Sequence, residues 1–266
     1  MFEHIARMGF SHVCLAPPFQ PASGGDIFVH ATFEHLHPAL EFPGPASDGM
    51  ACAVRQAEQA GLKLLLDIAP GSVATDSPLF QSHREWFASI SDTHIADPRQ
   101  PPHRVGVGSP HFEQTAVADA VSDWWIGILQ RWASLGVAGV RCLTLDAVPP
   151  SFWRRLTQAC PEMLFLAWTP GVPRTLLADL ATCGFDLTCS SAGWWDGKAE
   201  WFVEEIAALP WIGPALAGPE PSFSNRLASR LPHDANVSMV YRQALGIAAA
   251  TGAGLFIPMG FEYAAR

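Results

Sequence analysis

The feature that most constrains the fold of this chain is a regular alternation between short apolar segments and longer amphipathic ones. The short segments have the composition of strands buried on both faces, and helical patterns separate most of them. The helical segments tend to end at a glycine, as at Gly61, Gly136 and Gly184, where glycine commonly follows a helix C-terminus. This order predicts a parallel sheet with helical crossover connections.

The number of strand-like segments limits the kind of sheet. They are predicted to begin near His12, Leu62, Gly139, Met163, Gly184, Trp211 and Gly252. A closed barrel of this type needs eight strands, and too little chain precedes His12 for another strand and its helix. We therefore predict an α/β fold, a TIM-type barrel that is incomplete because the first strand is missing, with a gap between the strands at Val13 and Leu255. Either the barrel is open on one side, or the chain is part of a longer polypeptide.

The domain organisation follows from length and composition. With 266 residues, 49% of them hydrophobic and 15% charged, the chain can bury a large core, and residues 1–266 are predicted to form a single barrel domain. The Pro-, Gly- and His-rich stretch from Ser91 to His111 is too long for a simple connection. We expect it to be a surface excursion that is functional or mobile.

Charge and cysteine usage exclude several classes of partner. The formal net charge is −9 and no Lys/Arg cluster is present, so nucleic acid and membrane are not expected partners. No apolar run reaches the roughly 18 residues of a spanning helix, and the first ten residues lack a signal peptide pattern. The six cysteines have no CxxC spacing, which favours reduced thiols in a cytoplasmic protein.

Motifs for metals and cofactors are weak or missing. His35 and His37 have the spacing of one strand face, but no third ligand is evident. The sequence has neither a GxSxG elbow nor a phosphate-binding glycine loop. We therefore expect no metal and no cofactor.

A set of motifs along nearly the whole chain is more specific. In order, they are ARMGFSHVCLAPPF, HLHPAL, GLKLLLDIAPGSVATDSPLFQSHREWF, GVRCLTLDAVPPSFW, PEMLFLAWTPGVP, LATCGFDLTCSSAGWWDGK and YRQALGIAAATGAGLFIPMGFEY. On these motifs the chain resembles the catalytic barrel of glycoside hydrolase family 13, the α-amylase family. Within that family it most resembles the maltosyltransferases that extend α-1,4-glucans from maltose 1-phosphate.

The resemblance assigns three catalytic positions. The family's retaining chemistry uses a nucleophilic carboxylate after strand four, an acid after strand five and a third carboxylate near strand seven. These positions correspond to Leu143, Trp168 and Glu220 of this chain. An apolar side chain can neither attack a sugar carbon nor donate a proton to a leaving group. The resemblance therefore implies a barrel that has lost its nucleophile and its acid.

The polar residues that do match the family have two interpretations. Asp67 and Arg141 correspond to family residues and are candidate sugar contacts, together with Asp146 and Glu220. Alternatively, Asp67 caps the turn after its strand. Because a buried arginine needs a partner, Arg141 is then expected to pair with Asp67, Asp146 or Glu220.

Three of the ten tryptophans are candidates for binding sugar. Trp168, Trp194 and Trp195 follow predicted strands at the end where a barrel places its ligand. Their flat faces could form a platform for glucan rings. Alternatively, Trp168 plugs a cleft that no longer has a purpose.

Two functions remain open. The first is a non-catalytic barrel of α-glucan metabolism that binds α-glucan or maltooligosaccharide, or that scaffolds a catalytic domain or subunit. The second is an active α-glucan glycosidase or maltosyltransferase whose displaced carboxylates are Asp146 and Glu220. The first predicts that Leu143 and Trp168 lie side by side, with Arg141, Asp67 and Glu220 close by. It also predicts that no two carboxylates there stand about 5 Å apart across an open cleft.

Overall fold

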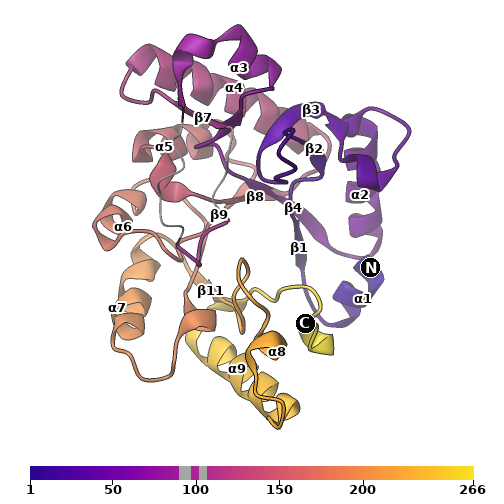
Figure 1. Cartoon of the computed structure of the whole chain (residues 1–266), viewed down its shortest axis with the longest axis vertical. Coiled ribbons are helices and arrows are strands. Elements are labelled where there is room, and N and C mark those ends of the chain that lie inside the picture. The colour runs from indigo at the N-terminus through magenta and orange to yellow at the C-terminus, as the bar shows by residue number, and fades with distance from the viewer. Residues whose placement is uncertain (90–96, 102–106) are drawn as a thin grey trace. The chain divides into compact units, whose positions relative to one another are not determined.

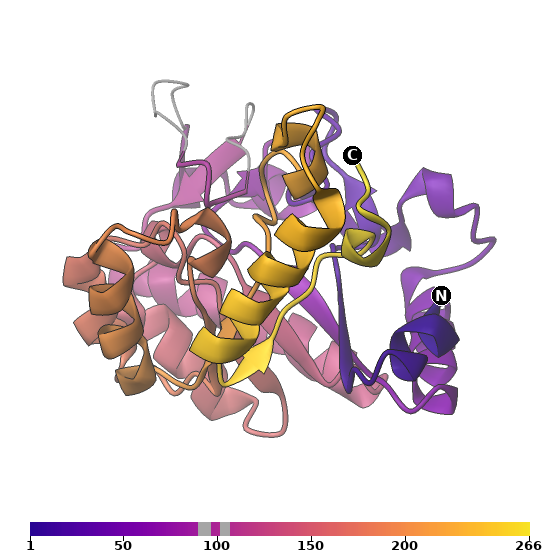
Figure 2. The ribbon, with the colours of Figure 1, turned by 90° about the horizontal axis from the view of Figure 1, so that it is seen from below.

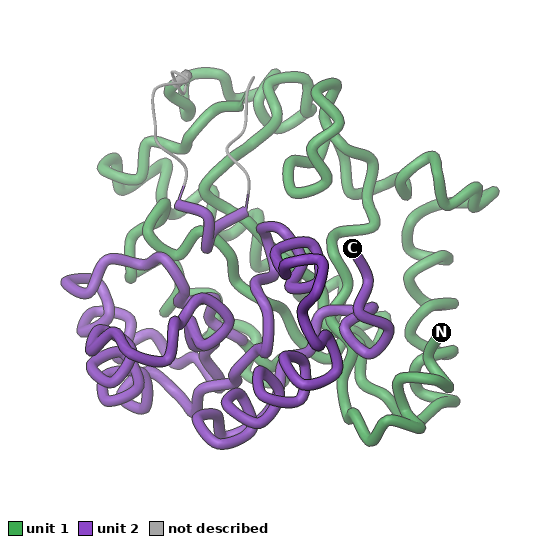
Figure 3. The backbone as a smooth tube through the Cα atoms, turned by 60° about the horizontal axis from the view of Figure 1, so that its bottom comes forward, with its two compact units in different colours: residues 1–94, 103–165 green, residues 95–102, 166–266 purple. Residues whose placement is uncertain are grey.

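The computed structural model describes residues 1–89, 97–101 and 107–266. It divides the chain into two compact units, which Figure 3 colours separately. Unit 1 contains residues 1–94 and 103–165, and unit 2 contains residues 95–102 and 166–266. Residues 90–96 and 102–106, all but the first of them in the predicted excursion, lie outside the described residues. The single barrel domain stays a prediction.

Helices and strands alternate along most of the chain (Figure 1). The helices are α1 (Phe2–Arg7), α2 (Ala46–Gln59), α3 (Pro78–Ser82), α4 (Thr115–Ser134), α5 (Pro150–Ala159), α6 (Arg174–Leu180), α7 (Trp201–Ala208), α8 (Leu227–Arg230) and α9 (Val237–Thr251). The strands of the main sheet are β1 (His12–Leu15), β4 (Lys63–Ile68), β8 (Gly139–Cys142), β9 (Leu164–Ala167), β10 (Leu187–Cys189), β11 (Ala215–Ala217) and β12 (Gly254–Leu255).

The main sheet confirms the predicted strand set. Its order is β1-β4-β8-β9-β10-β11-β12, which is the order of these strands along the chain, and neighbouring strands are parallel. Within the described residues β1 and β12 are the end strands of this order, as expected if the first barrel strand is missing. The division between the units falls inside β9, whose first half pairs in unit 1 and whose second half pairs in unit 2.

The first four strands begin within a residue of their predicted starts, whereas the last three begin later. Instead of Gly184, β10 begins at Leu187, because Gly184 has a φ of +80° and ends the turn after α6. Trp211 is the last residue of a 3-10 helix, so β11 begins at Ala215. Apolar composition alone does not distinguish such a turn from the strand that follows it.

Two small antiparallel sheets were not predicted. One pairs β2 (Phe19–Pro21) with β3 (His30–Leu36), and the other has the order β5-β7-β6. Its strands are β5 (Val73–Ala74), β6 (Phe87–Ser89) and β7 (Val107–Pro110). Both sheets belong to the long connections that follow β1 and β4, so they are insertions between barrel strands.

The core of unit 1 is built around β4 and β8. All residues of β4 after Lys63 are buried, which is the pattern of a strand covered on both faces. The residues of α2 that are buried recur at helical spacing: Ala46, Met50, Val54 and Ala57. At the start of β8, a Cβ on Gly139 would lie 2.2 Å from the carbonyl oxygen of Leu164 in β9. Only glycine permits this approach of the two strands.

Unit 2 has a core of its own. Ala192, Phe202, Ala217 and Ala248 form a buried cluster, against which Trp195 and Trp201 pack. α9 contacts β11 and β12, and Figure 2 shows it running beside β12. Across the described residues of both units, no helix is long and apolar enough to cross a membrane. The six cysteines, all within the described residues, form no disulfide. The cytoplasmic location stays a prediction.

Candidate functional site

Asp67 and Arg141 form a buried ion pair in unit 1. β4 and β8 are parallel neighbours in which Asp67 is in register with Arg141. The guanidinium donates from Nε to Oδ1 over 2.7 Å and from Nη2 to Oδ2 over 2.6 Å, and the two side chains are only 8% and 1% exposed. Such a bidentate pair fixes both side chains and neutralises a charge that would be unfavourable if buried alone. Of the three partners considered for Arg141, the structure selects Asp67.

A side chain from a third strand also contacts this pair. The thiol of Cys14, on β1, donates to Oδ1 of Asp67 over 3.2 Å. Asp67 thus receives hydrogen bonds from both strands that flank β4. The arginine was anticipated from the sequence, whereas the cysteine was not, because a lone thiol in an apolar strand carries no signal of this role.

The chain turns sharply after Leu143. The backbone N–H of Leu143 donates to Ile68 over 2.8 Å, which continues the ladder between β8 and β4, and its side chain is fully buried. The next residue, Thr144, has a φ of +53°, a left-handed conformation that ends the strand direction. Asp146 then lies in a 3-10 helix (Leu145–Ala147) and is exposed. The position assigned to the nucleophile is therefore apolar and enclosed, and the nearest carboxylate along the chain faces solvent.

Trp168, in unit 2, is enclosed by other side chains. It directly follows β9, is 2% exposed, and donates from its indole N–H to the carbonyl of Arg99 over 2.7 Å. Its ring makes edge contacts with Phe223 and Phe256, at centroid distances of 5.2 and 6.2 Å. A ring that is 2% exposed and bonded at its polar atom offers no open face to a sugar. This environment favours the plug over the platform.

Glu220 is also held by its surroundings. Its carboxylate is 2% exposed, approaches Nη2 of Arg226 to 2.6 Å and accepts a hydrogen bond from the backbone of Leu227 over 2.8 Å. Arg226 is anchored in turn by a bond from Nη1 to the carbonyl of Met259, 2.9 Å long. Both oxygens of Glu220 therefore have partners from the segment that leads into α8. Sequence reasoning missed Arg226, since it lies in an irregular segment without periodic pattern.

The other two tryptophans differ from each other. Trp195 is half-buried, stacks on Phe202 at 4.6 Å and donates to the carbonyl of Ala199 over 2.9 Å, so its role is packing. Trp194 lines a cavity of only about 10 Å³ together with Trp168 and Glu220. That volume accommodates about one water molecule and no sugar ring.

A further acid, which is half-buried, was not anticipated. Glu205 of α7 accepts hydrogen bonds from the backbone N–H and the hydroxyl of Ser191, at 3.0 and 2.6 Å. Burial raises the pKa of this carboxyl above its ordinary value, against the opposing effect of the Ser191 bonds and of the charges on Arg99 and Arg174. Nothing in the pattern of the sequence marks this residue, because its burial arises from packing between α7 and the loop after β10.

The structure thus places the predicted residues in two groups. Asp67, Arg141 and Leu143 belong to unit 1, whereas Trp168, Trp194 and Glu220 belong to unit 2. That these groups share one barrel mouth stays a prediction. His35 lies in β3, whereas His37 precedes a 3-10 helix and accepts from the backbone of Ala39 over 3.1 Å. Over the described part of the chain, no three His, Cys, Asp or Glu side chains gather into a metal-binding group.

Known proteins resemble the chain in sequence. It is 32% identical to the α-1,4-glucan:maltose-1-phosphate maltosyltransferase of Burkholderia pseudomallei over 98% of its own length, which covers 24% of that protein. It is 28% identical to the enzyme of the same name from Corynebacterium pseudotuberculosis, again over 98% of the chain and over 41% of the relative. The chain thus spans less than half the length of these curated relatives. No protein-family model matches it.

Solved structures resemble the chain in fold. A maltogenic α-amylase from Thermotoga neapolitana superposes with a TM-score of 0.72 at 17% identity, covering all of this chain and 63% of that one. The likeness confirms the α/β fold of α-amylase barrel type. The chain covers only part of that neighbour, and its described residues form seven parallel strands of the eight that close such a barrel, as expected for an incomplete barrel. The predicted resemblance to the glycoside hydrolase family 13 barrel is confirmed.

Proposed function

We propose that this chain is a non-catalytic barrel of α-glucan metabolism that binds α-glucan or maltooligosaccharide, or that scaffolds a catalytic domain or subunit in the cytoplasm. One observation carries the proposal. At the position that the resemblance assigns to the acid, Trp168 is 2% exposed and donates its polar proton to the main chain of Arg99. A side chain in this state supplies no proton to a leaving group.

The chemistry of the family supports this assignment. A retaining transfer needs two carboxyl groups about 5 Å apart on opposite sides of the scissile bond. Leu143 stands at the assigned nucleophile position with no exposed surface. Without these groups the stabilisation specific to the transition state is lost, whereas binding of a sugar in its ground state does not depend on them.

The active alternative requires displaced carboxylates, and the surroundings of the two candidates disfavour it. Asp146 is exposed in its 3-10 helix, so no surrounding side chains hold its carboxylate toward a substrate. Glu220 is neutralised by Arg226 and bonded to Leu227. A carboxylate with both oxygens occupied is a poor nucleophile and a poor acid.

Two assays on the whole chain test the proposal. Transfer from maltose 1-phosphate to maltooligosaccharide, and hydrolysis or phosphorolysis of glycogen and maltooligosaccharides, are expected to stay at background. Calorimetric titration with maltoheptaose is expected to show binding if glucan, rather than a protein partner, is the ligand. Turnover by the unmodified chain that Asp146→Asn or Glu220→Gln abolishes would contradict the proposal and establish the displaced-carboxylate enzyme.

A further inference from the structure

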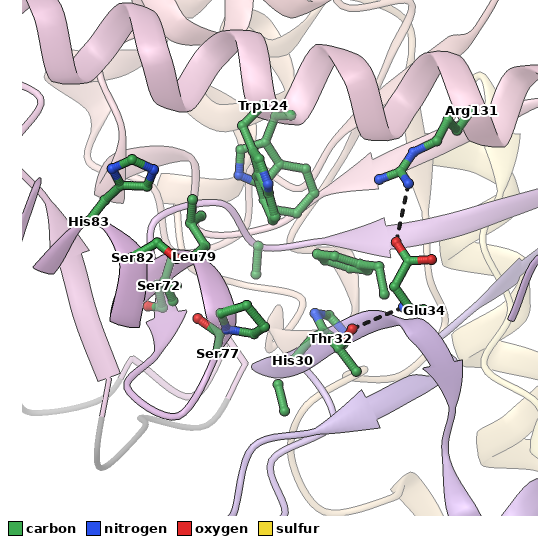
Figure 4. Close-up of a pocket in the computed structure, with 16 residues that line it drawn as sticks. His30, Thr32, Glu34, Ser72, Ser77, Leu79, Ser82, His83, Trp124 and Arg131 are labelled. Atoms are coloured by element: carbon green, nitrogen blue, oxygen red, sulfur yellow. Dashed lines mark hydrogen bonds and ion pairs between the residues drawn. The ribbon is translucent and has the colours of Figure 1, made fainter. Parts of the chain in front are cut away.

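Unit 1 contains a cavity of about 370 Å³ that none of the residues assigned by the resemblance lines. Its walls come from β3, α3, α4 and the turn after β4, and Figure 4 shows them around the opening. Pockets that hold small ligands measure about 300–1,000 Å³. The cavity is therefore large enough for a ligand, in contrast to the 10 Å³ space beside Trp194.

One wall of the cavity is aromatic. Trp124 and Trp125 of α4 and Phe33 of β3 line it, with Trp124 5.3 Å from Trp125 and 5.7 Å from Phe33 between ring centroids. Within this wall Trp125 is buried, whereas Trp124 is only half-buried and projects from α4 toward the opening (Figure 4). A flat ring in this position can pack against the C–H face of a sugar.

The facing wall carries hydroxyl groups. Ser72, Ser77 and Thr32 line it (Figure 4). The oxygen of Ser77 accepts from the backbone of Phe80 over 3.2 Å, and that of Thr32 accepts from Glu34 over 3.1 Å, so each hydroxyl keeps its proton for donation.

The cavity lining also includes a residue with a buried hydrogen-bond donor. The indole N–H of Trp125, a residue that lines the cavity and is 3% exposed, has no hydrogen-bond partner within the described residues. Buried donors are normally satisfied by protein, water or ligand.

The charges at the cavity cancel. Glu34 and Arg131 form an ion pair of 3.2 Å at one end, with side chains 69% and 62% exposed. His83 stacks on Trp86 with 3.8 Å between ring centroids, at the other end in Figure 4. With neutral histidines the lining has no net charge, which disfavours a phosphorylated ligand. The carboxylate and guanidinium remain able to bind hydroxyl groups as acceptor and donor.

We propose that this cavity binds a short stretch of a neutral α-glucan, with one sugar face against Trp124 and its hydroxyl groups toward Ser72, Ser77 and Thr32. The inference rests on the proposed function and gives it a location. Glucan binding then needs no open site at the enclosed Trp168. An aromatic wall facing a hydroxyl wall matches a sugar, which is apolar on its faces and polar at its edges.

The test is a titration of the whole chain with maltoheptaose, followed by calorimetry and tryptophan fluorescence. Trp124→Ala removes the exposed ring and is expected to weaken binding about tenfold or more. Ser72→Met leaves the aromatic wall intact, removes one hydroxyl group and narrows the cavity, so it is expected to weaken binding to a similar extent. Circular dichroism and thermal unfolding establish that each variant is folded.

Two tryptophans of unit 2 provide matched controls. Trp211 is 79% exposed at a separate cavity of about 680 Å³, and Trp194 lies beside the small cavity described above. Trp211→Ala and Trp194→Ala are expected to leave the affinity unchanged. If Trp211→Ala or Trp194→Ala weakens binding while Trp124→Ala and Ser72→Met do not, the location inferred for the site is wrong. The proposed function as a glucan-binding barrel is then still supported. If the unmodified chain does not bind maltoheptaose, the inference fails and only the scaffolding form of the proposed function remains.

Discussion

The two units each bury a carboxylate paired with an arginine, but they hold the pair in different ways. In unit 1, Asp67 and Arg141 are separated by 74 residues and meet because two parallel strands are in register. In unit 2, Glu220 and Arg226 belong to the same connection, and the arginine side chain is 27% exposed. The first pair depends on the sheet, whereas the second depends on the loop that leads to α8.

This difference shows two ways in which the surrounding structure holds an acid at a family position. Both Asp67 and Glu220 stand where the resemblance places acidic residues, and each has an arginine as its partner. A buried ion pair contributes little net stability compared with an apolar pair of the same shape, but losing one partner leaves an unfavourable buried charge. Each acid is thus retained by its arginine, and more strongly where that arginine is buried.

The largest expected effect on stability comes from adding a carboxylate to the core of each unit. Leu143→Asp combined with Trp168→Glu places two acids at positions that are 0% and 2% exposed. We expect a loss of more than about 5 kcal/mol in the free energy of unfolding, because neither charge is solvated. Urea denaturation measures it. Transfer from maltose 1-phosphate is expected to stay at background, since catalytic groups work only when supporting residues hold them to within about 0.5 Å. A stable variant with measurable turnover would contradict both expectations.

Next in size is the removal of the charge of Asp67. Asp67→Asn keeps the shape but leaves the buried guanidinium of Arg141 without its anion, which we expect to destabilise the chain by about 3–5 kcal/mol. Combining it with Arg141→Met as a double-mutant cycle separates the pair's coupling from the loss of packing. A loss below about 1 kcal/mol in the single variant would mean that the pair is as weak as a surface ion pair.

Glu220→Gln is expected to have a smaller effect. The amide still accepts the hydrogen bond from Leu227, and Arg226 keeps its bond to the carbonyl of Met259, so we expect a loss of about 1–2 kcal/mol. Equal losses for Asp67→Asn and Glu220→Gln in the same denaturation series would refute the contrast drawn between the two pairs.

The smallest expected effect is a pH dependence at Glu205. Burial raises the pKa of its carboxyl above the ordinary 4.5, so the folded state favours the protonated form. The stability that this proton contributes is present below the unfolded pKa and is lost as the pH rises through the raised value. Glu205→Gln should therefore gain thermal stability relative to the parent chain between pH 4 and pH 7, as followed by scanning calorimetry. As a control, Glu204→Gln removes an exposed neighbouring carboxylate that pairs with Arg174, and a trend of the same size in this variant would contradict the assignment to Glu205.

The parts of the fold that local chemistry controls could be predicted from the sequence. Gly61 and Gly136 have positive φ values and end the turns after α2 and α4. Because glycine marks such turns in the sequence, the starts of β4 and β8 were predicted to within one residue. The pairing of Asp67 with Arg141 was among the expected arrangements because consecutive barrel strands are neighbours.

Contacts with irregular segments could not be predicted in this way. The acceptor for Trp168 is a main-chain carbonyl, and its position depends on the path of a connection rather than on its side chains. The same holds for Arg226 beside Glu220 and for Ser191 beside Glu205.

The close approach of β8 to β9 has a consequence for how this chain can evolve. Every amino acid except glycine carries a Cβ, and at Gly139 that atom would overlap the carbonyl of Leu164. A library of all single substitutions should therefore yield no folded clones at this position, whereas Leu143 should accept other apolar residues of similar volume. Selection for a soluble barrel alone would preserve Gly139 and leave the nucleophile position free to drift among hydrophobic residues. Under such selection a barrel can lose its catalytic activity and still keep its fold.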